Sequence, residues 1–282
     1  MKKTSILIGI LVGLMFSLLL APAHADVEWT IKKDLPLGAK PLDMASSVDG
    51  RWIFILVPRE VIIYSPSEDK VINRIPVEKG FDKLIYSSKD DMLILSNSRQ
   101  KMLRMIQIEK VYEISVSGLP YRGPETAPVT IIVFTDYQCP YCARLEPLLQ
   151  QMLEKYPDKV KLVFKNFPLA MHKSARNAAA AALAANVQGK FWEYGEMLFQ
   201  NYRGLDDAKI QAIAKGLNLN MEQFNSDMKS PAIRERINQD IKNGQAAEVR
   251  GTPTVFINGK LLKNKSLNGF TEKIETELEK KE

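Results

Sequence analysis

The chain has very few residues that could staple it covalently or bind a metal ion. Only two cysteines and two histidines occur among its 282 residues, whereas a structural zinc site takes four such ligands. Both cysteines lie in one tetrapeptide, Cys139-Pro140-Tyr141-Cys142. A disulfide across so short a loop constrains the unfolded chain little, because this stabilisation grows with loop length. The pair is better suited to cycling between dithiol and disulfide than to a structural or zinc-binding role. We expect no metal and no cofactor.

Concentrated charge and long apolar runs are also scarce. The formal net charge is +6, from 39 basic and 33 acidic residues, and the basic residues are scattered along the chain. No basic patch interleaved with aromatic residues is present, which argues against nucleic-acid binding. Beyond the N-terminus, no segment approaches the 18 or so consecutive apolar residues typical of a transmembrane helix. We therefore expect the mature protein to be soluble.

The N-terminus has the three-part pattern of a secretory signal peptide. Lys2 and Lys3 precede an almost wholly apolar stretch at residues 6–20, and Ala23-His24-Ala25 supplies small residues at a cleavage site. This pattern predicts cleavage after Ala25 and a periplasmic or extracytoplasmic location, where thiols become oxidised. The alternative is an uncleaved membrane anchor, but the apolar run is short for a core about 30 Å thick.

Residues 26–110 have the pattern of a small all-β domain. Runs of β-branched and apolar residues alternate with turn-forming residues; we expect strands at residues 51–57, 60–64, 92–95 and 102–108. Leu42-Asp43 and a following Ser-Ser pair recur as Phe81-Asp82 and a second Ser-Ser pair, at a spacing of roughly 40 residues that is typical of propeller blades. Two such units cannot close a ring, so this domain is expected to be a β-meander with blade-like sheets.

Residues 111–282 instead alternate between strand and helix patterns. A buried strand is expected at 129–134, a helix at 141–156, a strand at 160–164 and a hairpin at 254–262 that turns at Asn258-Gly259. The two-residue Asn-Gly turn is a strong hairpin signal. A long helical stretch lies between the second strand and the hairpin, at about 172–249, and a last helix is expected at 270–280. The pattern predicts an α/β domain with a helical insertion.

The expected chain path gives the two cysteines different environments. Cys139 follows a strand and begins a helix, where free N–H groups and the helix dipole favour a thiolate. Pro140 suits the first helical turn because its missing N–H leaves no bond unmade. Cys142 lies one turn further along and is shielded. We therefore expect Cys139 to exchange with a substrate and Cys142 to resolve the mixed disulfide.

Three sequence blocks, at residues 130–144, 160–169 and 251–260, closely resemble the DsbA-like thiol:disulfide oxidoreductases. The resemblance extends over residues 112–282. It implies an α/β thioredoxin fold with a helical insertion, preceded here by the all-β domain. It also implies that Pro253 is a cis-proline facing the cysteines and that the backbone of Thr252 binds an extended substrate segment. The implied partners are exported protein substrates and a quinone-linked membrane protein that reoxidises the pair.

Two positions depart from the family pattern. Strongly oxidising members carry a histidine between the cysteines, whereas Pro140-Tyr141 supplies no charge here. Thioredoxin has a buried carboxylate six residues before its first cysteine, a position occupied here by Val133. Three other polar residues lie near the expected site. Two of them, Asp136 and Lys165, are candidates for handling protons, but structural roles explain all three more simply. We expect a capping or turn role for Asp136, a solvated strand end for Lys165, and a surface or capping role for His172.

The sequence leaves the direction of exchange open. The leading hypothesis is disulfide formation in exported proteins through Cys139 and Cys142. A second is a disulfide isomerase or reductase that forms a homodimer through residues 26–110. A third makes the β-rich domain a client-binding module that the thiol domain serves.

Overall fold

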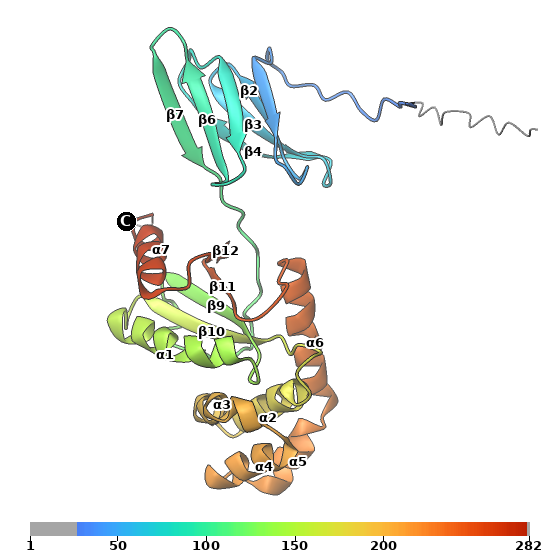
Figure 1. Ribbon diagram of the computed structural model, residues 1–282, viewed down its shortest axis with the longest axis vertical. Coiled ribbons are helices and arrows are strands. Elements are labelled where there is room, and N and C mark those ends of the chain that lie inside the picture. Colours follow the sequence, from blue (N-terminus) through green and yellow to red (C-terminus); the bar gives the residue numbers. More distant parts are fainter. Residues whose placement is uncertain (1–26, 281–282) are drawn as a thin grey trace, which may run out of the picture. The chain divides into compact units, whose positions relative to one another are not determined.

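The computed structural model describes residues 27–280 of the chain (Figure 1). The predicted signal peptide, residues 1–25, lies outside the described residues. Within the described part, no helix is both long enough and apolar enough to cross a membrane.

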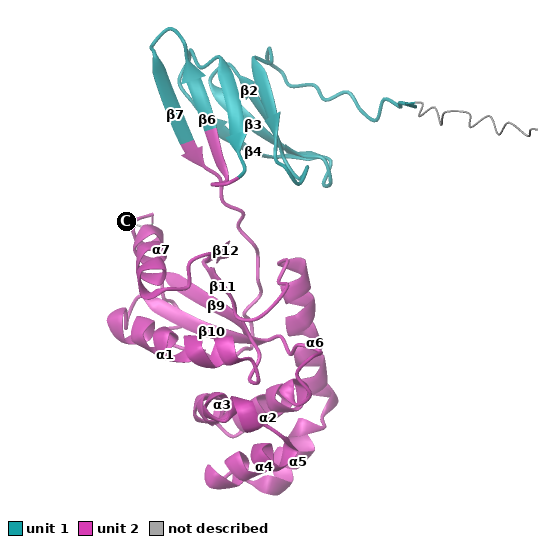
Figure 2. Ribbon diagram, viewed as in Figure 1, with its two compact units in different colours: residues 1–88, 94–105 teal, residues 89–93, 106–282 magenta. Residues whose placement is uncertain are grey.

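The chain forms two compact units (Figure 2). Unit 1 comprises residues up to 88 together with 94–105, and unit 2 comprises residues 89–93 and 106–282. Strands β6 (Met92–Asn97) and β7 (Met102–Gln107) cross the boundary between the units. Each unit is described below by itself.

Unit 1 is built from two small sheets. The first sheet has the order β1-β2-β3-β4 and is antiparallel throughout; its strands are β1 (Asp43–Ser46), β2 (Ile53–Val57), β3 (Glu60–Ser65) and β4 (Lys70–Pro76). The second has the order β5-β6-β7 and begins with β5 (Lys83–Ser87). Neither sheet closes into a ring or barrel in the described part of the chain. The expected all-β fold with open, blade-like sheets is thus confirmed.

Alternation along the apolar strands explains the packing of unit 1, since successive side chains of a strand point to opposite faces. On β2, Ile55 and Val57 pack in one cluster with Ile62, Leu35 and Leu37. Phe54, on the other face, stacks on Tyr86 of β5 with ring centroids 5.2 Å apart. Sequence patterns missed β1, β4 and β5. Strand β4 lies at a sheet edge and most of its residues are exposed, so it lacks the apolar run of a central strand.

Unit 2 has a five-stranded mixed sheet with the order β12-β11-β9-β10-β8. Its strands are β8 (Tyr121–Arg122), β9 (Val129–Thr135), β10 (Val160–Asn166), β11 (Thr254–Ile257) and β12 (Lys260–Leu261). Strand β9 is central, parallel to β10 and antiparallel to β11. One face of β9 packs through Ile131 and Val133 into the main core, which includes helices α1 (Pro140–Lys155) and α7 (Leu267–Glu279). Its other face packs through Ile132 and Phe134 against Phe256.

The helical insertion consists of five α-helices and one 3-10 turn, gathered beside the sheet of unit 2 (Figure 1). The α-helices are α2 (Ala175–Val187), α3 (Phe191–Gln200), α4 (Asp207–Gly216), α5 (Met221–Met228) and α6 (Pro231–Ala246). Asp206, Asn220 and Ser230 each cap a helix by accepting a hydrogen bond from a backbone N–H in the first turn. Most of the alanines of α2 are buried. The predicted thioredoxin fold with a helical insertion is confirmed, and the long helical stretch expected at about 172–249 is divided into these separate helices.

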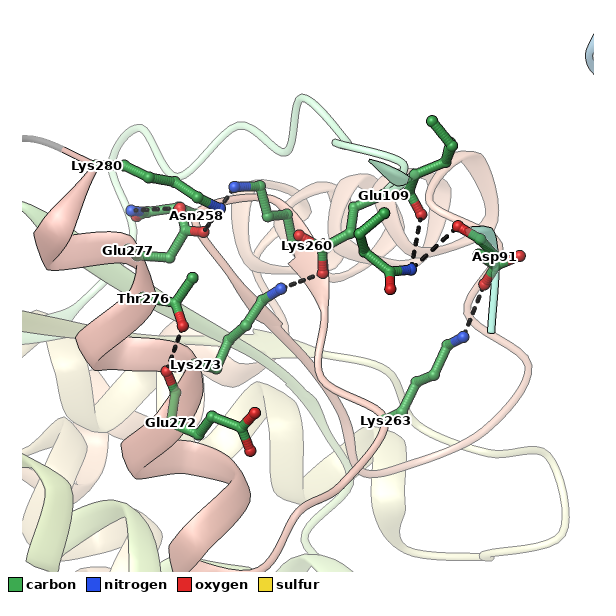
Figure 3. Close-up of polar contacts among 12 residues, drawn as sticks. Asp91, Glu109, Asn258, Lys260, Lys263, Glu272, Lys273, Thr276, Glu277 and Lys280 are labelled. Atoms are coloured by element: carbon green, nitrogen blue, oxygen red, sulfur yellow. Dashed lines mark hydrogen bonds and ion pairs between the residues drawn. The ribbon is translucent and has the colours of Figure 1, made fainter. Parts of the chain in front are cut away.

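The C-terminal hairpin and helix α7 are joined by polar contacts (Figure 3). Asn258 and Gly259 both have positive φ angles, as the predicted two-residue turn requires. The side chain of Glu277 on α7 is 6% exposed and contacts Lys260 at 2.6 Å and Lys280 at 3.0 Å. Burial opposes ionisation of Glu277, but these two lysines outweigh it and lower the pKa of its carboxyl. The hairpin that carries β11 is therefore fixed to the last helix.

Candidate functional site

Cys139 lies at the junction between the central strand and the first helix of unit 2. Strand β9 ends at Thr135, and α1 begins with Pro140 in its first turn, so Cys139 is the N-cap residue. Its carbonyl oxygen accepts hydrogen bonds from the N–H groups of Cys142 and Ala143, each at 3.1 Å. Both cysteines are free thiols and are buried, with 3% of each residue exposed. The first thiol therefore lies at the positive end of the helix dipole.

The two thiols have opposite acidities. A hydrogen bond from the thiol of Cys142 is the main cause that lowers the pKa of Cys139 to about 5, against the opposing effect of burial. Smaller contributions come from the Thr252 hydroxyl and from the N–H groups of Cys142 and Tyr141. Burial raises the pKa of Cys142, and the neighbouring Cys139 raises it further. One sulfur thus favours the thiolate form and the other favours the thiol form.

The loop before β11 lies beside the first sulfur. The peptide bond between Thr252 and Pro253 is cis, as the resemblance implied. In its protonated form, the Sγ of Cys139 donates a hydrogen bond to the carbonyl oxygen of Thr252 at 3.4 Å. The Thr252 hydroxyl oxygen is buried and, beside the neutral thiol, has no hydrogen-bond partner among the described residues; a thiolate at Cys139 could accept from it. The structure therefore brings together Cys139, Cys142 and Thr252.

Tyr141, between the cysteines, is 63% exposed. The guanidinium of Arg144 lies over its ring, 4.5 Å from the ring centroid. A cation therefore lies near the residues between the cysteines, although neither of those residues is charged. Arg144 was not among the site residues expected from the sequence. Its position one helical turn after Pro140 is the signal that could have identified it.

Asp136 and His172 form a pair that the sequence analysis did not anticipate. The Asp136 side chain is fully buried, and its Oδ2 accepts a hydrogen bond at 2.8 Å from Nδ1 of His172, whose side chain is 19% exposed. The expected turn role of Asp136 is present, because its Oδ1 accepts from the N–H of Gln138 at 2.8 Å. The expected surface or capping role of His172 is wrong, since its ring binds a buried carboxylate.

Lys165 is 1% exposed, so the expected solvated strand end is also wrong. Its Nζ lies 3.0 Å from Oδ1 of Asp240 and donates to the carbonyl oxygen of Ser115 at 2.9 Å. Asp240 is completely buried on α6 and also accepts hydrogen bonds from the backbone and side chain of Asn166. Helix α6 packs against β10, so the end of this strand is covered and not solvated.

A separate open groove of about 1200 Å³ runs along α1. It is lined in part by Arg122, Glu146, Glu196 and Tyr202. Neither cysteine, Thr252 nor Pro253 lines it, so we do not assign thiol chemistry to this groove. Within residues 27–280, no group of three or more His, Cys, Asp or Glu side chains could hold a metal ion.

The strand order, the helical insertion and a cysteine pair at the start of α1 define a thioredoxin fold of the DsbA-like kind. A family model described as Thioredoxin matches residues 116–276. This match extends over more than half of the chain, and the protein belongs to that family.

Solved structures support the same assignment. The oxidised form of BdbD from Bacillus subtilis has 26% sequence identity and a TM-score of 0.52, over 61% of this chain and 98% of that chain. The thiol-disulfide exchange protein α-DsbA2 from Wolbachia pipientis has 25% identity and a TM-score of 0.53, over 57% of this chain and 88% of the other. A thioredoxin-like oxidoreductase from Silicibacter pomeroyi has 27% identity and a TM-score of 0.52, over 58% and 94%. The resemblance to DsbA-like proteins is confirmed.

Curated relatives of another kind match about half of the chain. The Na(+)/H(+) antiporter NhaA 3 of Salinispora tropica is 37% identical over 140 residues, which are 49% of this chain and 21% of the antiporter. The antiporter NhaA 1 of Mycolicibacterium gilvum is 31% identical over 163 residues, which are 57% and 25% of the two chains. The matches thus cover about a fifth to a quarter of these relatives, and we carry no transport activity over to this protein.

Proposed function

We propose that this protein is an exported thiol:disulfide oxidoreductase that forms disulfides in other exported proteins. The observation that carries this proposal is the place of Cys139 as the N-cap of α1, with Cys142 buried one turn further on, which agrees with the opposite acidity of the two thiols. A stable thiolate favours the reduced form of the pair, and a pair that favours its reduced form readily gives its disulfide to another protein. The confirmed family, with neighbours that are thiol-disulfide oxidoreductases, supports the reaction class.

In the first step, a client thiolate attacks the Sγ of Cys139 in the oxidised pair. The bond between client and Cys139 forms, the bond between Cys139 and Cys142 breaks, and the electron pair leaves on the sulfur of Cys142. That sulfur takes up a proton, because burial raises its pKa.

In the second step, another client thiolate attacks the client sulfur of the mixed disulfide. Cys139 leaves as a thiolate, and a thiol of low pKa leaves faster. The client has then lost two electrons and gained a disulfide, and the pair holds both electrons as a dithiol. An external oxidant must accept these electrons, and we propose a quinone-linked membrane partner for that role.

Four neighbouring residues are assigned supporting roles. The Thr252 carbonyl and Pro253 lie on the loop that contacts the sulfur of Cys139, and we assign them to binding an extended client segment. Pro140 and Tyr141 occupy the first turn of α1 and modulate the thiol pair. In this proposal, residues 111–282 form the catalytic domain, residues 26–110 form a β-rich N-terminal domain, and cleavage after Ala25 releases the protein into the periplasm or its equivalent.

The direct test is the reduction potential of the cysteine pair. Purified mature protein is equilibrated with glutathione buffers of defined ratio, and the free thiols are counted by alkylation. A disulfide donor is expected at about −120 to −160 mV, the oxidising end of the known range. A value below about −200 mV would instead identify a reductase or isomerase.

An isomerase or reductase that dimerises through residues 26–110 is the second candidate. Exposed apolar side chains on unit 1 favour it, because Ile85 is 59%, Leu103 67% and Met105 68% exposed. Leu103 and Met105 are two residues apart on β7 and therefore point to the same face. Light scattering of the mature protein should then give the mass of a dimer, and Leu103→Lys should give that of a monomer. If the wild type is a monomer, these exposed side chains remain available to a client protein. That outcome would favour the third hypothesis, in which the β-rich domain is a client-binding module.

A further inference from the structure

We propose that His172 is a positioning residue for the thiol pair, acting through Asp136 on the turn that presents Cys139. This proposal rests on the proposed thiol-exchange function and extends it to a residue outside the Cys-Pro-Tyr-Cys segment. His172 does not act on the client in this scheme. It holds the carboxylate that organises the turn before the reactive sulfur.

Asp136 is the central group of this turn. Its carbonyl oxygen accepts a hydrogen bond from the N–H of Cys139 at 3.0 Å. Its carboxylate accepts from the N–H groups of Gln138 and Leu169, each at 2.8 Å. The His172 ring supplies the remaining hydrogen bond to this carboxylate, also at 2.8 Å. The backbone around Cys139 is thereby fixed to the segment that joins β10 to α2.

Gln138 connects the same turn to two further segments. Its side-chain oxygen accepts from the N–H of Ser174 at 2.6 Å, and its side-chain nitrogen donates to the carbonyl oxygen of Leu205 at 3.1 Å. The position of Cys139 therefore depends on contacts with the helical insertion. Among these hydrogen bonds of Asp136 and Gln138, the bond between Asp136 and His172 joins two ionisable side chains.

A buried carboxylate on the turn that carries a reactive thiol creates an electrostatic constraint. Asp136 lies three residues before Cys139 and has no exposed side-chain area, so water cannot screen its charge effectively. A neighbouring negative charge opposes formation of a second one. The Nδ1–H of His172 offsets the carboxylate charge at 2.8 Å. Removing this donor should therefore make the Cys139 thiolate less stable and the reduced pair less favourable.

The test compares variants that lack the donor with a variant that keeps it. His172→Leu and His172→Ala remove the donor, and the leucine also fills much of the space left by the ring. In His172→Asn, the side-chain amide can place an N–H close to the position of Nδ1. Lys173→Ala is the matched control, because it removes an exposed positive charge next to His172 along the chain.

Two quantities are measured for each full-length mature variant. The first is the equilibrium constant of the cysteine pair with glutathione, and the second is the melting temperature of the oxidised and reduced forms. The donor-free variants are expected to shift the equilibrium at least tenfold toward the disulfide form, which corresponds to about 30 mV. His172→Asn and Lys173→Ala are expected to stay within about threefold of wild type, a difference of less than about 0.7 kcal/mol.

The two melting temperatures separate positioning from general structural support. A purely structural role would lower the stability of both redox forms equally and leave the equilibrium constant unchanged. A folded donor-free variant with the wild-type constant would overturn the proposal, as would an equal shift in His172→Asn. Failure of the proposed function would appear differently, as a wild-type pair that does not cycle with glutathione or that has a reducing potential.

Discussion

The two units of this protein bury polar groups in different ways. In unit 1 the buried polar residues are neutral, namely Ser47, Ser65 and Asn97. Each of them contacts a partner only two or three residues away, as Ser47 does with Asp49 and Asn97 with Gln100. In unit 2 the buried groups also include charged side chains, and some of their partners are distant along the chain. Asp136 and His172 are 36 residues apart.

This difference separates two uses of a buried hydrogen bond. A local bond closes a turn, which is what an all-β unit with short connections needs. A bond between distant segments fixes one segment against another and can place a reactive group between them. Furthermore, three buried side-chain atoms without a hydrogen-bond partner among the described residues belong to unit 2: Tyr137 Oη, Asp227 Oδ2 and Thr252 Oγ1. The comparison predicts that substitutions of buried polar groups affect chemistry in unit 2 and only local structure in unit 1.

The largest predicted effect is loss of disulfide exchange in Cys139→Ala. Cys139 carries the thiol of lowered pKa, and without it no mixed disulfide with a client can form. Cys142→Ala should instead accumulate mixed disulfides, since the resolving thiol is absent. Both are measured by oxidation of a reduced client protein and by non-reducing electrophoresis. Ser65→Ala in unit 1 is the control and should exchange at the wild-type rate; normal turnover in Cys139→Ala would refute the mechanism.

The second prediction concerns the buried ion pair of unit 2. Lys165→Met should leave the Asp240 carboxylate buried without its cation, which costs about 3–5 kcal/mol of unfolding free energy. The measurement is the urea midpoint of the oxidised protein, followed by fluorescence and circular dichroism. Lys33→Met is the matched control in unit 1, where Lys33 and Asp69 form a solvent-exposed pair 2.7 Å apart. It should not move the midpoint measurably, and equal shifts in the two variants would contradict the assigned difference in burial.

The third prediction is the pH dependence of the thiol pair. The pKa of Cys139 is lowered to about 5, whereas an unfolded thiol titrates near about 8.5. The reduced form is therefore stabilised by this thiolate. The stabilisation is complete above about pH 8.5 and is lost as the pH falls through about 5. Thiolate absorbance near 240 nm should show one group titrating near pH 5. A single transition near pH 8.5 would show that the environment of Cys139 does not stabilise its thiolate.

Much of unit 2 could be predicted from the sequence because its signals are local. The apolar run of β9, the alanine-rich α2 and the turn at Asn258-Gly259 each indicate their structure within a few residues. The end of the strand pattern before Cys139, with Pro140 after it, likewise indicated that Cys139 begins a helix. The edge strands β1 and β4 were missed, because an exposed strand carries neither a long apolar run nor a clear alternation.

The missed features of the candidate site share a physical cause. Lys165 and His172 were assigned to the surface because charged and imidazole side chains are usually exposed when considered alone. Both are instead paired with a carboxylate, and those carboxylates lie 75 and 36 residues away along the chain. Such a pairing depends on tertiary structure. No local pattern distinguishes Asp240 from the other acidic residues on exposed helices.

The smallest predicted effect concerns Thr252, whose hydroxyl is buried without a hydrogen-bond partner among the described residues and helps to lower the pKa of Cys139. Thr252→Val keeps the shape of the side chain and removes this donor. The equilibrium constant with glutathione should then move toward the disulfide form by about tenfold or less, the range expected for one hydrogen bond. Thr252→Ser retains the hydroxyl and should stay near wild type. Because the hydroxyl has no hydrogen-bond partner among the described residues when the thiolate is absent, its removal should not destabilise the oxidised protein. An equal loss of stability in both redox forms would instead make Thr252 a packing residue, comparable to the buried polar residues of unit 1.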